Sequence, residues 1–202
     1  MEKAAQEPPP AERNRPRGCA EEARRSLVEP LYGTVLELGA SSGANLPHYK
    51  GVARVVAVNR SGASGAARLR ASAPTGIPVS VVTAAPGRLP FRDRSFDAVV
   101  STMALCAAPD QATALAEIRR VLSPDGVLVF LEHVRSRNHW TAGMQDMMTP
   151  VVRRLRSGCR INVDTVTAIR AAGFRLSVLD ILEPRAGVPR LVPFVRGRAY
   201  LP

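Results

Sequence analysis

Five short apolar runs recur between residues 34 and 132, and they constrain the fold more than any other feature of the sequence. Each run is hydrophobic at consecutive positions and is bounded by Gly, Pro, Asp or Arg. Unbroken hydrophobicity over such short stretches is typical of strands that are buried on both faces, as in a parallel sheet. The expected strands are Thr34–Leu38, Arg54–Val58, Val79–Thr83, Phe96–Thr102 and Val127–Glu132.

Segments with a helical pattern separate these runs. In residues 110–122 the side chains of Leu115, Ile118 and Val121 fall on one stripe of a helix, and Pro124-Asp125-Gly126 then predicts a helix stop and a turn. Strands that alternate with helices indicate βαβ units with right-handed crossovers, and therefore an α/β fold. Further helices are expected at Ser61–Ala73, Met144–Leu155 and Val163–Ala172, and two late strands at Leu176–Leu182 and Val195–Leu201.

The chain of 202 residues is long enough for one well-packed domain and too short for two of ordinary size. Residues 1–25 mix prolines with charges of both signs and offer almost nothing to bury. We therefore expect residues 1–25 to form a disordered or weakly helical polar arm, and residues 26–202 to form a single domain.

The formal net charge of +11 raises the question of a polyanionic partner such as nucleic acid. Only Lys3 and Lys50 are lysines, so the charge is almost entirely arginine, and the abundance of Arg and Ala fits a compositional bias equally well. The sequence has no lysine-rich run and no basic stretch interleaved with aromatic residues. We therefore expect a small-molecule partner and not nucleic acid.

The three cysteines, Cys19, Cys106 and Cys159, lie far apart and include no CxxC pair. They match neither a disulfide framework nor the spacing of a zinc-ligand set, so we expect no metal site and a reducing, cytoplasmic setting. No window reaches the ~18–20 consecutive apolar residues of a membrane-spanning helix, so no transmembrane segment is expected.

The first apolar run ends in a glycine turn that reads LELGASSG over residues 36–43. A buried strand that leads through an acid into such a turn is how α/β sheets bind nucleotides, because glycine lets the backbone approach a ligand. The same letters also match the G-x-S-x-G elbow of α/β-hydrolases, which would make Ser41 a nucleophile. Such an elbow follows several strands, whereas this turn follows the first, so the nucleotide site is favoured and the hydrolase stays open.

The rest of the chain carries further motifs at fixed places relative to the expected strands. They are Leu89-Pro90-Phe91 before Ser95-Phe96-Asp97, then Leu105-Cys106, Glu132-His133-Val134, and Gly158-Cys159 ahead of Asn162 and Thr165. Together with the glycine turn these motifs resemble the class I S-adenosylmethionine-dependent methyltransferases over residues 34–200, and in particular the methyltransferase-like 7 thiol S-methyltransferases and their bacterial relatives.

The resemblance implies a Rossmann-like α/β fold with a mostly parallel seven-stranded sheet and helices on both faces. It also implies S-adenosyl-L-methionine as the cofactor and methyl transfer to a small-molecule acceptor such as a thiol. The animal members of the family carry an N-terminal membrane segment, and this chain has the polar arm in its place, so membrane attachment is not expected to carry over.

Carried onto this chain, the family's first cofactor motif falls on Glu37, Gly39 and Gly43, with Glu37 under the methionine part of the ligand. Ser41 stands where that motif has its middle glycine. At the end of the second strand the family has an acid that binds both ribose hydroxyls, and the chain has Asn59. An amide in place of that carboxylate is expected to cost on the order of 1–3 kcal/mol of binding free energy.

The resemblance places the remaining cofactor contacts at Ala85 and Pro86, where the family's acid near the adenine is missing, and at Thr102 and Met103. The departures at Ser41, Asn59 and Ala85 leave a second hypothesis open. It is a methyltransferase-like protein that is catalytically weak or inactive and serves in binding or assembly.

His133, just past the fifth expected strand, is the best-placed candidate for a catalytic base, and a loop histidine bonded to backbone is an equal alternative. A thiol acceptor needs little help from a base, because a thiol with a pKa near ~8.5 is already a few per cent thiolate at neutral pH. Cys106 and Cys159 are expected to be structural. The methionines of Met144–Leu155 are expected to form an apolar wall over the active-site edge.

Overall fold

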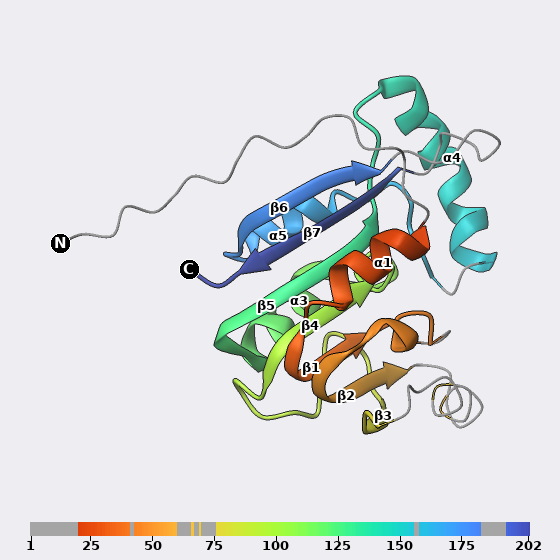
Figure 1. The fold of residues 1–202 in the computed structure, drawn as a ribbon. Coiled ribbons are helices and arrows are strands. Elements are labelled where there is room, and N and C mark those ends of the chain that lie inside the picture. Colours follow the sequence, from red (N-terminus) through yellow and green to blue (C-terminus); the bar gives the residue numbers. More distant parts are fainter. Residues whose placement is uncertain are drawn as a thin grey trace.

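The computed structural model describes residues 20–40, 43–59, 66, 69, 76–155, 158–182 and 193–202. Within them the chain forms a seven-stranded sheet flanked by helices (Figure 1). The strands are β1 (Tyr32–Leu38), β2 (Gly51–Asn59), β3 (Val79–Thr83), β4 (Phe96–Thr102), β5 (Leu122–His133), β6 (Arg175–Leu182) and β7 (Phe194–Tyr200). The helices are α1 (Ala20–Val28), the short 3-10 helix η2 (Leu46–His48), α3 (Gln111–Val121), α4 (His139–Leu155) and α5 (Thr165–Ala171).

The strands follow the order β3-β2-β1-β4-β5-β7-β6 across the sheet. β1 to β5 are parallel to their neighbours, and β7 runs antiparallel between β5 and β6. The expectation of a mostly parallel, seven-stranded sheet is therefore confirmed. The helix expected at Ser61–Ala73 lies outside the described residues, apart from Ala66 and Leu69.

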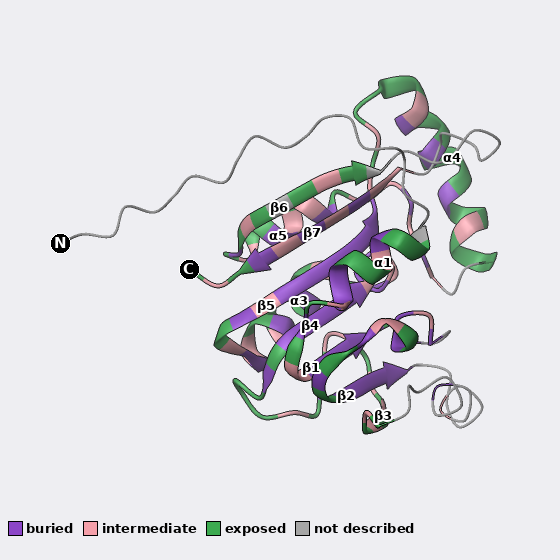
Figure 2. Ribbon diagram, in the orientation of Figure 1, coloured by how far each residue is buried: buried purple, intermediate pink, exposed green. Residues whose placement is uncertain are grey.

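Each face of the sheet has its own apolar core, as unbroken hydrophobic runs require. Successive side chains of a strand point to opposite faces, so Val35 packs with α1 on one face and Leu36 packs with α3 and α5 on the other. The central strands are buried along most of their length, whereas exposed positions gather on α1, α4 and the edge strands (Figure 2). Helices thus cover both faces, as expected.

The boundary expected between arm and domain falls inside α1, which begins at Ala20 and crosses residue 25. Ala23, Leu27 and Val28 are buried against the sheet. These three side chains form a narrow apolar stripe that lies within a charged stretch, and such a stripe suffices to dock a helix of this length. The domain therefore includes part of the expected arm.

β5 begins at Leu122, directly after α3, which is earlier than the sequence predicted. The turn expected at Pro124-Asp125-Gly126 lies inside this strand. Its effect is an irregularity in the pairing with β4, where Phe96 pairs with Leu122 and Ala98 pairs with Val127. The helix stop was correct, but residues 123–126 are accommodated opposite the single residue Asp97 as an irregularity of the pairing rather than as a separate turn.

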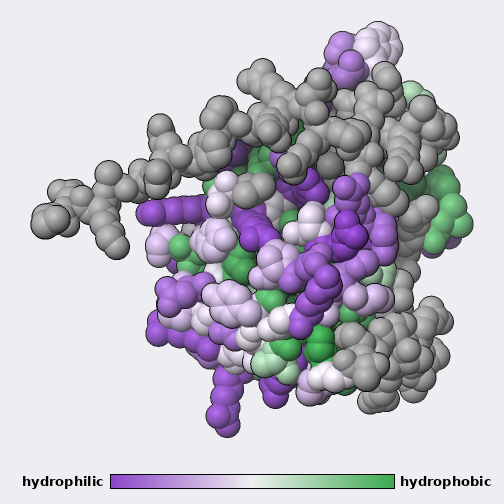
Figure 3. All heavy atoms as spheres, in the orientation of Figure 1, coloured by the Kyte–Doolittle hydropathy of each residue, from purple (hydrophilic) through white to green (hydrophobic). Residues whose placement is uncertain are grey.

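α4 stands apart from the sheet at the side where β5 ends (Figure 1). Its buried side chains are Ala142, Gln145 and Thr149, whereas Met147 is 71% exposed and Leu155 is 79% exposed. Hydrophobic side chains accordingly appear at the edge of the molecule near the end of this helix, beside a face on which hydrophilic side chains predominate (Figure 3). The methionines of this helix are exposed to solvent and are not part of the core, and the apolar wall over the active-site edge stays a prediction. Among the described residues, no helix combines the length and the hydrophobicity that a bilayer crossing needs.

Candidate functional site

Most of the sequence-predicted site residues follow strands that end at one edge of the sheet. β1, β2, β4 and β5 are parallel, and Leu38 pairs with Val58 on one side and with Ser101 on the other. The residues that follow these pairs therefore share the carboxyl edge, where open α/β sheets bind their ligands. They are Gly39 after β1, Asn59 at the end of β2, Thr102 and Met103 at the end of β4, and His133 at the end of β5.

The glycine turn after β1 packs directly on the loop after β4. Gly39 has φ +73°, and a Cβ there would lie 2.9 Å from Ala104 Cβ and 3.2 Å from the Thr102 carbonyl oxygen. Gly43 also has a positive φ, of 67°, and its N–H donates to the Ala40 carbonyl at 3.0 Å. Both the close approach and the left-handed backbone require glycine at residue 39. Ser41 lies outside the described residues, so its position stays untested.

Met103 adopts the left-handed region with φ +53°, which is uncommon for a residue with a side chain. Its N–H donates to the Leu131 carbonyl at 2.8 Å, so the chain leaves β4 in a fixed direction. Strained backbone of this kind concentrates at ligand-binding loops. The cofactor contact that the sequence predicted for this residue stays a prediction.

Glu37 lies beneath the glycine turn with an exposed fraction of only 1%. Its carboxylate accepts the Tyr49 hydroxyl at 2.9 Å and the Asn45 side-chain amide at 3.2 Å. Burial raises the pKa of Glu37 to about 7, although both hydrogen bonds and the charge of Arg24 oppose the shift. The side chain therefore supports the turn from within the protein.

Asn45 links this carboxylate to the neighbouring strand end and to α1. Its amide nitrogen also donates to the Thr102 hydroxyl at 2.9 Å, and its carbonyl oxygen accepts from the Arg24 guanidinium at 3.1 Å. The Thr102 side chain is thus held in place by the loop after β1. This connection could not be predicted from the sequence, because Asn45 was assigned no role in any motif.

The positions expected around the nucleoside differ in their exposure. Asn59 ends β2 opposite Thr83 and is buried, with an exposed fraction of 1%. Ala85 is exposed, pairs with Arg88 in an isolated bridge, and is followed by the partly buried Pro86. Residues 84–87 contain no acid, so no carboxylate from this segment would face an adenine.

Glu132 organises the loop after β4, and sequence reasoning had assigned it no role. The carboxylate is fully buried and accepts the Ser101 hydroxyl at 2.7 Å. It also accepts the backbone N–H groups of Ala104 and Leu105 at 3.0 Å each and that of Cys106 at 2.9 Å. Burial raises its pKa, and the hydrogen bonds oppose that rise. A buried carboxylate with this many donors fixes the course of the loop.

His133 is buried between two cysteines and an aromatic ring, with an exposed fraction of 4%. Its Nδ1 lies 3.0 Å from Cys159 Sγ and 3.4 Å from Cys106 Sγ, and the two sulfurs are 3.2 Å apart. The imidazole packs on the Phe194 ring with the ring centroids 4.5 Å apart. The pKa of the Cys106 thiol is raised by the hydrogen bond with Cys159, by burial and by the charge of Glu132. His133 therefore bonds to thiols, and not to backbone as the alternative reading of a loop histidine had it.

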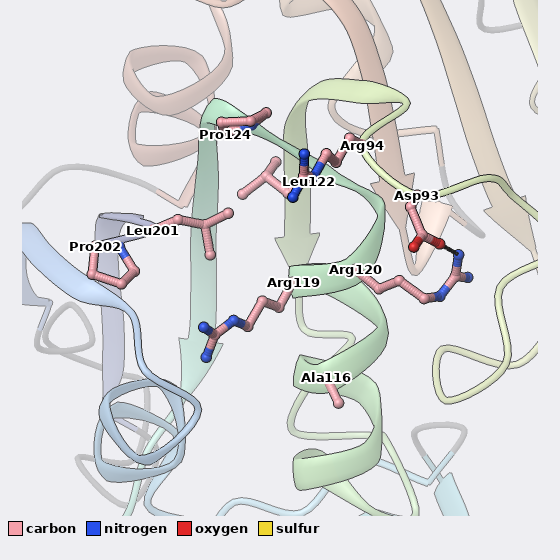
Figure 4. Close-up of a pocket in the computed structure, with 9 residues that line it drawn as sticks. All are labelled: Asp93, Arg94, Ala116, Arg119, Arg120, Leu122, Pro124, Leu201 and Pro202. Carbon is pink, nitrogen blue, oxygen red and sulfur yellow. Dashed lines mark hydrogen bonds and ion pairs between the residues drawn. The ribbon is translucent and has the colours of Figure 1, made fainter.

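A groove at the opposite edge of the sheet belongs to a different part of the fold (Figure 4). It lies where β4 and β5 begin, next to the end of α3, and Arg120 forms an ion pair with Asp93 beside it at 2.7 Å. Cofactors of α/β sheets bind at the carboxyl edge and not at the amino edge. This groove is therefore not the cofactor site. Its lining residues are Asp93, Arg94, Ala116, Arg119, Arg120, Leu122, Pro124, Leu201 and Pro202.

Comparison with known proteins finds similarity to methyltransferases. Residues 36–130 match the model of the methyltransferase domain family. The human thiol S-methyltransferase TMT1A is 27% identical over 170 residues, which cover 82% of this chain and 70% of that protein.

Two solved structures share the fold. The [4+2]-cyclase SpnF has a TM-score of 0.71 at 18% identity and covers 91% of this chain and 80% of its own. Geranyl diphosphate methyltransferase in complex with SAM has a TM-score of 0.69 at 16% identity and covers 90% of this chain and 84% of its own. Since one of these proteins is a cyclase, the fold by itself does not specify methyl transfer.

Proposed function

We propose that the chain is a class I S-adenosylmethionine-dependent methyltransferase that methylates the sulfur of a small thiol. S-adenosyl-L-methionine is its cofactor and its acceptor is a small molecule. The similarity to a thiol S-methyltransferase along 82% of the chain is the observation that carries the choice of a thiol.

The residues at the carboxyl edge fit this cofactor by their chemistry. Asn59 presents an amide, which both donates and accepts hydrogen bonds, at the strand end where a ribose would be held. Thr102 supplies a hydroxyl at the end of β4, and Ala85 with Pro86 gives small apolar contacts suited to a purine. We propose that these residues, with Met103 and the turn at Gly39, Ser41 and Gly43, hold the cofactor, while Glu37 supports that turn from below.

S-adenosylmethionine supplies the reactive methyl group on its sulfonium, so the protein contributes binding and alignment. The fixed loop after β4 sets the position of Thr102 and Met103, because Glu132 accepts three of its backbone N–H groups. Such a rigid support is what holding two reactants in line requires. A small thiol needs no strong base, since about a few per cent is ionised at neutral pH.

A base role for His133 stays a prediction from the sequence. Its Nδ1 lies within hydrogen-bond distance of two thiols. Proton transfer from an acceptor would therefore have to use the other ring nitrogen.

The proposal also includes a cytoplasmic setting without a nucleic-acid partner. Its support is that the three cysteines of the sequence include no CxxC pair and match no disulfide framework, which fits a reducing compartment. The hydrophilic side chains on the face shown in Figure 3 belong to a solvated surface, which is the common use of scattered charges.

The experiment is a methyl-transfer assay with labelled S-adenosylmethionine and three acceptors of one carbon skeleton: a thiol, an alcohol and an amine. We expect an S-methyl product from the thiol and none from the alcohol or the amine. The Gly39→Val variant should give no product, because it closes the approach to the turn. Label on the amine alone, or on none of the three, would contradict the proposal.

A further inference from the structure

We propose that Cys106, His133 and Cys159 form a zinc-binding site with three protein ligands and an open fourth position. The three side chains come from distant parts of the sequence: the loop after β4, the end of β5 and the segment before α5. Their ligand atoms all lie within 4.8 Å of one another, and all three residues are buried. The inference goes beyond the proposed function and does not depend on the identity of the acceptor.

The chemistry of the set favours zinc. Two thiolates and one imidazole are soft and intermediate ligands, and Zn²⁺ is bound by this combination with one position left for water or substrate. Within the described residues the cluster contains three candidate ligand atoms and no fourth. Closed structural zinc sites have four protein ligands, whereas sites that exchange a ligand have three, so the cluster resembles the second kind.

The distances suit an ion that sits beside the plane of the three ligand atoms. The ligand atoms form a triangle with sides of 3.0, 3.2 and 3.4 Å. With Zn–S and Zn–N bonds of ~2.3 and ~2.0 Å, the ion would lie about 1.2 Å out of that plane. Tetrahedral angles would need the sulfurs to separate by roughly 0.5 Å more, which small side-chain rotations provide.

The backbone around the cluster is held in place by bonds that involve none of the ligand atoms. The Arg160 N–H, next to Cys159, donates to the Cys106 carbonyl at 2.9 Å. Glu132 accepts the Cys106 N–H, and the Thr165 hydroxyl lies 3.5 Å from the His133 carbonyl. The site is therefore formed before any ion binds, which reduces the ordering that binding would otherwise cost.

The side chains around the cluster are apolar or of soft character. Met103, Val152 and Val163 pack against Cys106 and Cys159. Met103 lies at the end of β4, where the cofactor is proposed to bind, and Cys106 follows it by three residues in the sequence. The cluster and the proposed methyl-transfer site therefore share the loop after β4. We infer that a small thiolate, the acceptor class of the proposed function, can take the fourth position; this part alone rests on that proposal.

The test measures metal binding by the full chain without cofactor or acceptor, so its result is independent of methyl transfer. The protein is reduced, freed of metal and titrated with Zn²⁺ against a competing chelator under anaerobic conditions. We expect one Zn²⁺ per chain, and affinity lower by about tenfold or more in Cys106→Ser, Cys159→Ser and His133→Ala. The control His139→Ala, which changes a histidine outside the cluster, should bind as the wild type does, and we expect the same of Cys19→Ser, which changes the remaining cysteine of the sequence.

Co²⁺ in the wild-type protein keeps the test decisive if the variants fail to fold. A thiolate-to-cobalt charge-transfer band with intense visible bands is expected for a four-coordinate site with sulfur ligands. An added small thiol should shift the visible bands, and an unchanged spectrum would overturn the open position. Absence of zinc binding by the reduced protein, binding that only Cys19→Ser removes, or a Cys106–Cys159 disulfide in a protein that binds no zinc after reduction would overturn the site.

Discussion

The carboxylate of Glu132 accepts the backbone N–H of Cys106 at 2.9 Å, so a side chain near the end of β5 fixes the loop that follows β4. The same carboxylate accepts the N–H groups of Ala104 and Leu105. Two parallel strands are thereby tied together at the carboxyl edge. The loop carries Met103 on one side and Cys106 on the other, so a single buried acid positions parts of both proposed sites.

The first prediction concerns this acid. Replacing Glu132 by Gln keeps the size but puts an NH2 group where a backbone N–H now donates, which leaves buried donors unsatisfied. We expect the free energy of unfolding to fall by about 3 kcal/mol at neutral pH. Chemical denaturation of the wild type and variant measures this, and a loss below about 1 kcal/mol would show that the loop does not depend on the carboxylate.

The second prediction concerns Glu37, the other buried acid, whose pKa of about 7 exceeds its ordinary value of 4.5. Because the folded state binds the proton more tightly than the unfolded state, stability falls as the pH rises from 4.5 to about 7. The whole shift corresponds to roughly 3 kcal/mol. Glu37→Gln removes this loss, so the variant should exceed the wild type by about that amount at about pH 8 and by much less near pH 5.

Denaturation of the two proteins at both pH values gives the difference, in which the other titrating groups cancel. A variant that is less stable than the wild type at about pH 8 would show that the ionised carboxylate is favourable where it lies.

The third prediction concerns Asn59, which ends β2 with an exposed fraction of 1%. Asn59→Asp restores a carboxylate toward the ribose hydroxyls and should strengthen S-adenosylmethionine binding by about tenfold or more, equivalent to ~1–3 kcal/mol. Because the position is buried, the charge should lower the stability of the cofactor-free protein. Asn59→Leu, which has similar size and no polar group, is the control and should bind more weakly. An Asp variant with unchanged or weaker affinity would mean that the ribose lies elsewhere.

The fourth prediction concerns the contribution of α1 to stability, as distinct from that of the residues before Ala20. Removal of residues 1–25 takes away the buried Ala23 and the hydrogen bond from Arg24 to Asn45. We expect a loss of about 2–4 kcal/mol of unfolding free energy, from lost burial and an unsatisfied amide. A truncation that starts at Ala20 keeps the helix and is the matched control. Equal stability of the two truncated proteins would contradict the role of α1.

The sequence predicted the sheet well because its evidence was local. The run Phe96–Thr102 contains consecutive apolar residues at 98–100, and burial of the strand on both faces follows without any knowledge of its neighbours. Val79–Thr83 was placed with equal accuracy for the same reason. The glycine turn at residue 39 was found because a positive φ angle favours glycine, and this requirement is visible in a single residue of the sequence.

The side-chain contacts of the site could not be predicted in this way. Cys106, His133 and Cys159 share no local spacing, and they meet only because β4 lies beside β5 and the segment before α5 returns to the same edge. The absence of a CxxC pair had argued against a metal site, although that rule detects only ligands that are close in sequence.

The buried face of α4 could not be predicted for a related reason. Its methionines lie at helical spacing, which suggested an inward apolar face. Gln145 is buried in their place, because its side chain bonds to the Val134 and Ile161 carbonyls and to the Ser136 N–H. A polar residue that satisfies three backbone groups outweighs an apolar stripe, and the partners that decide this are distant in the sequence.

The central claim is that the carboxyl edge of the sheet binds S-adenosylmethionine, and calorimetric titration of the full chain tests it most directly. The account predicts a single site with a dissociation constant on the order of micromolar. It also predicts no binding by Gly39→Val, in which a branched side chain would meet Ala104 and the Thr102 carbonyl. The absence of heat up to about millimolar ligand, in a folded wild-type protein, would contradict the claim and favour a methyltransferase-like protein that has lost its cofactor.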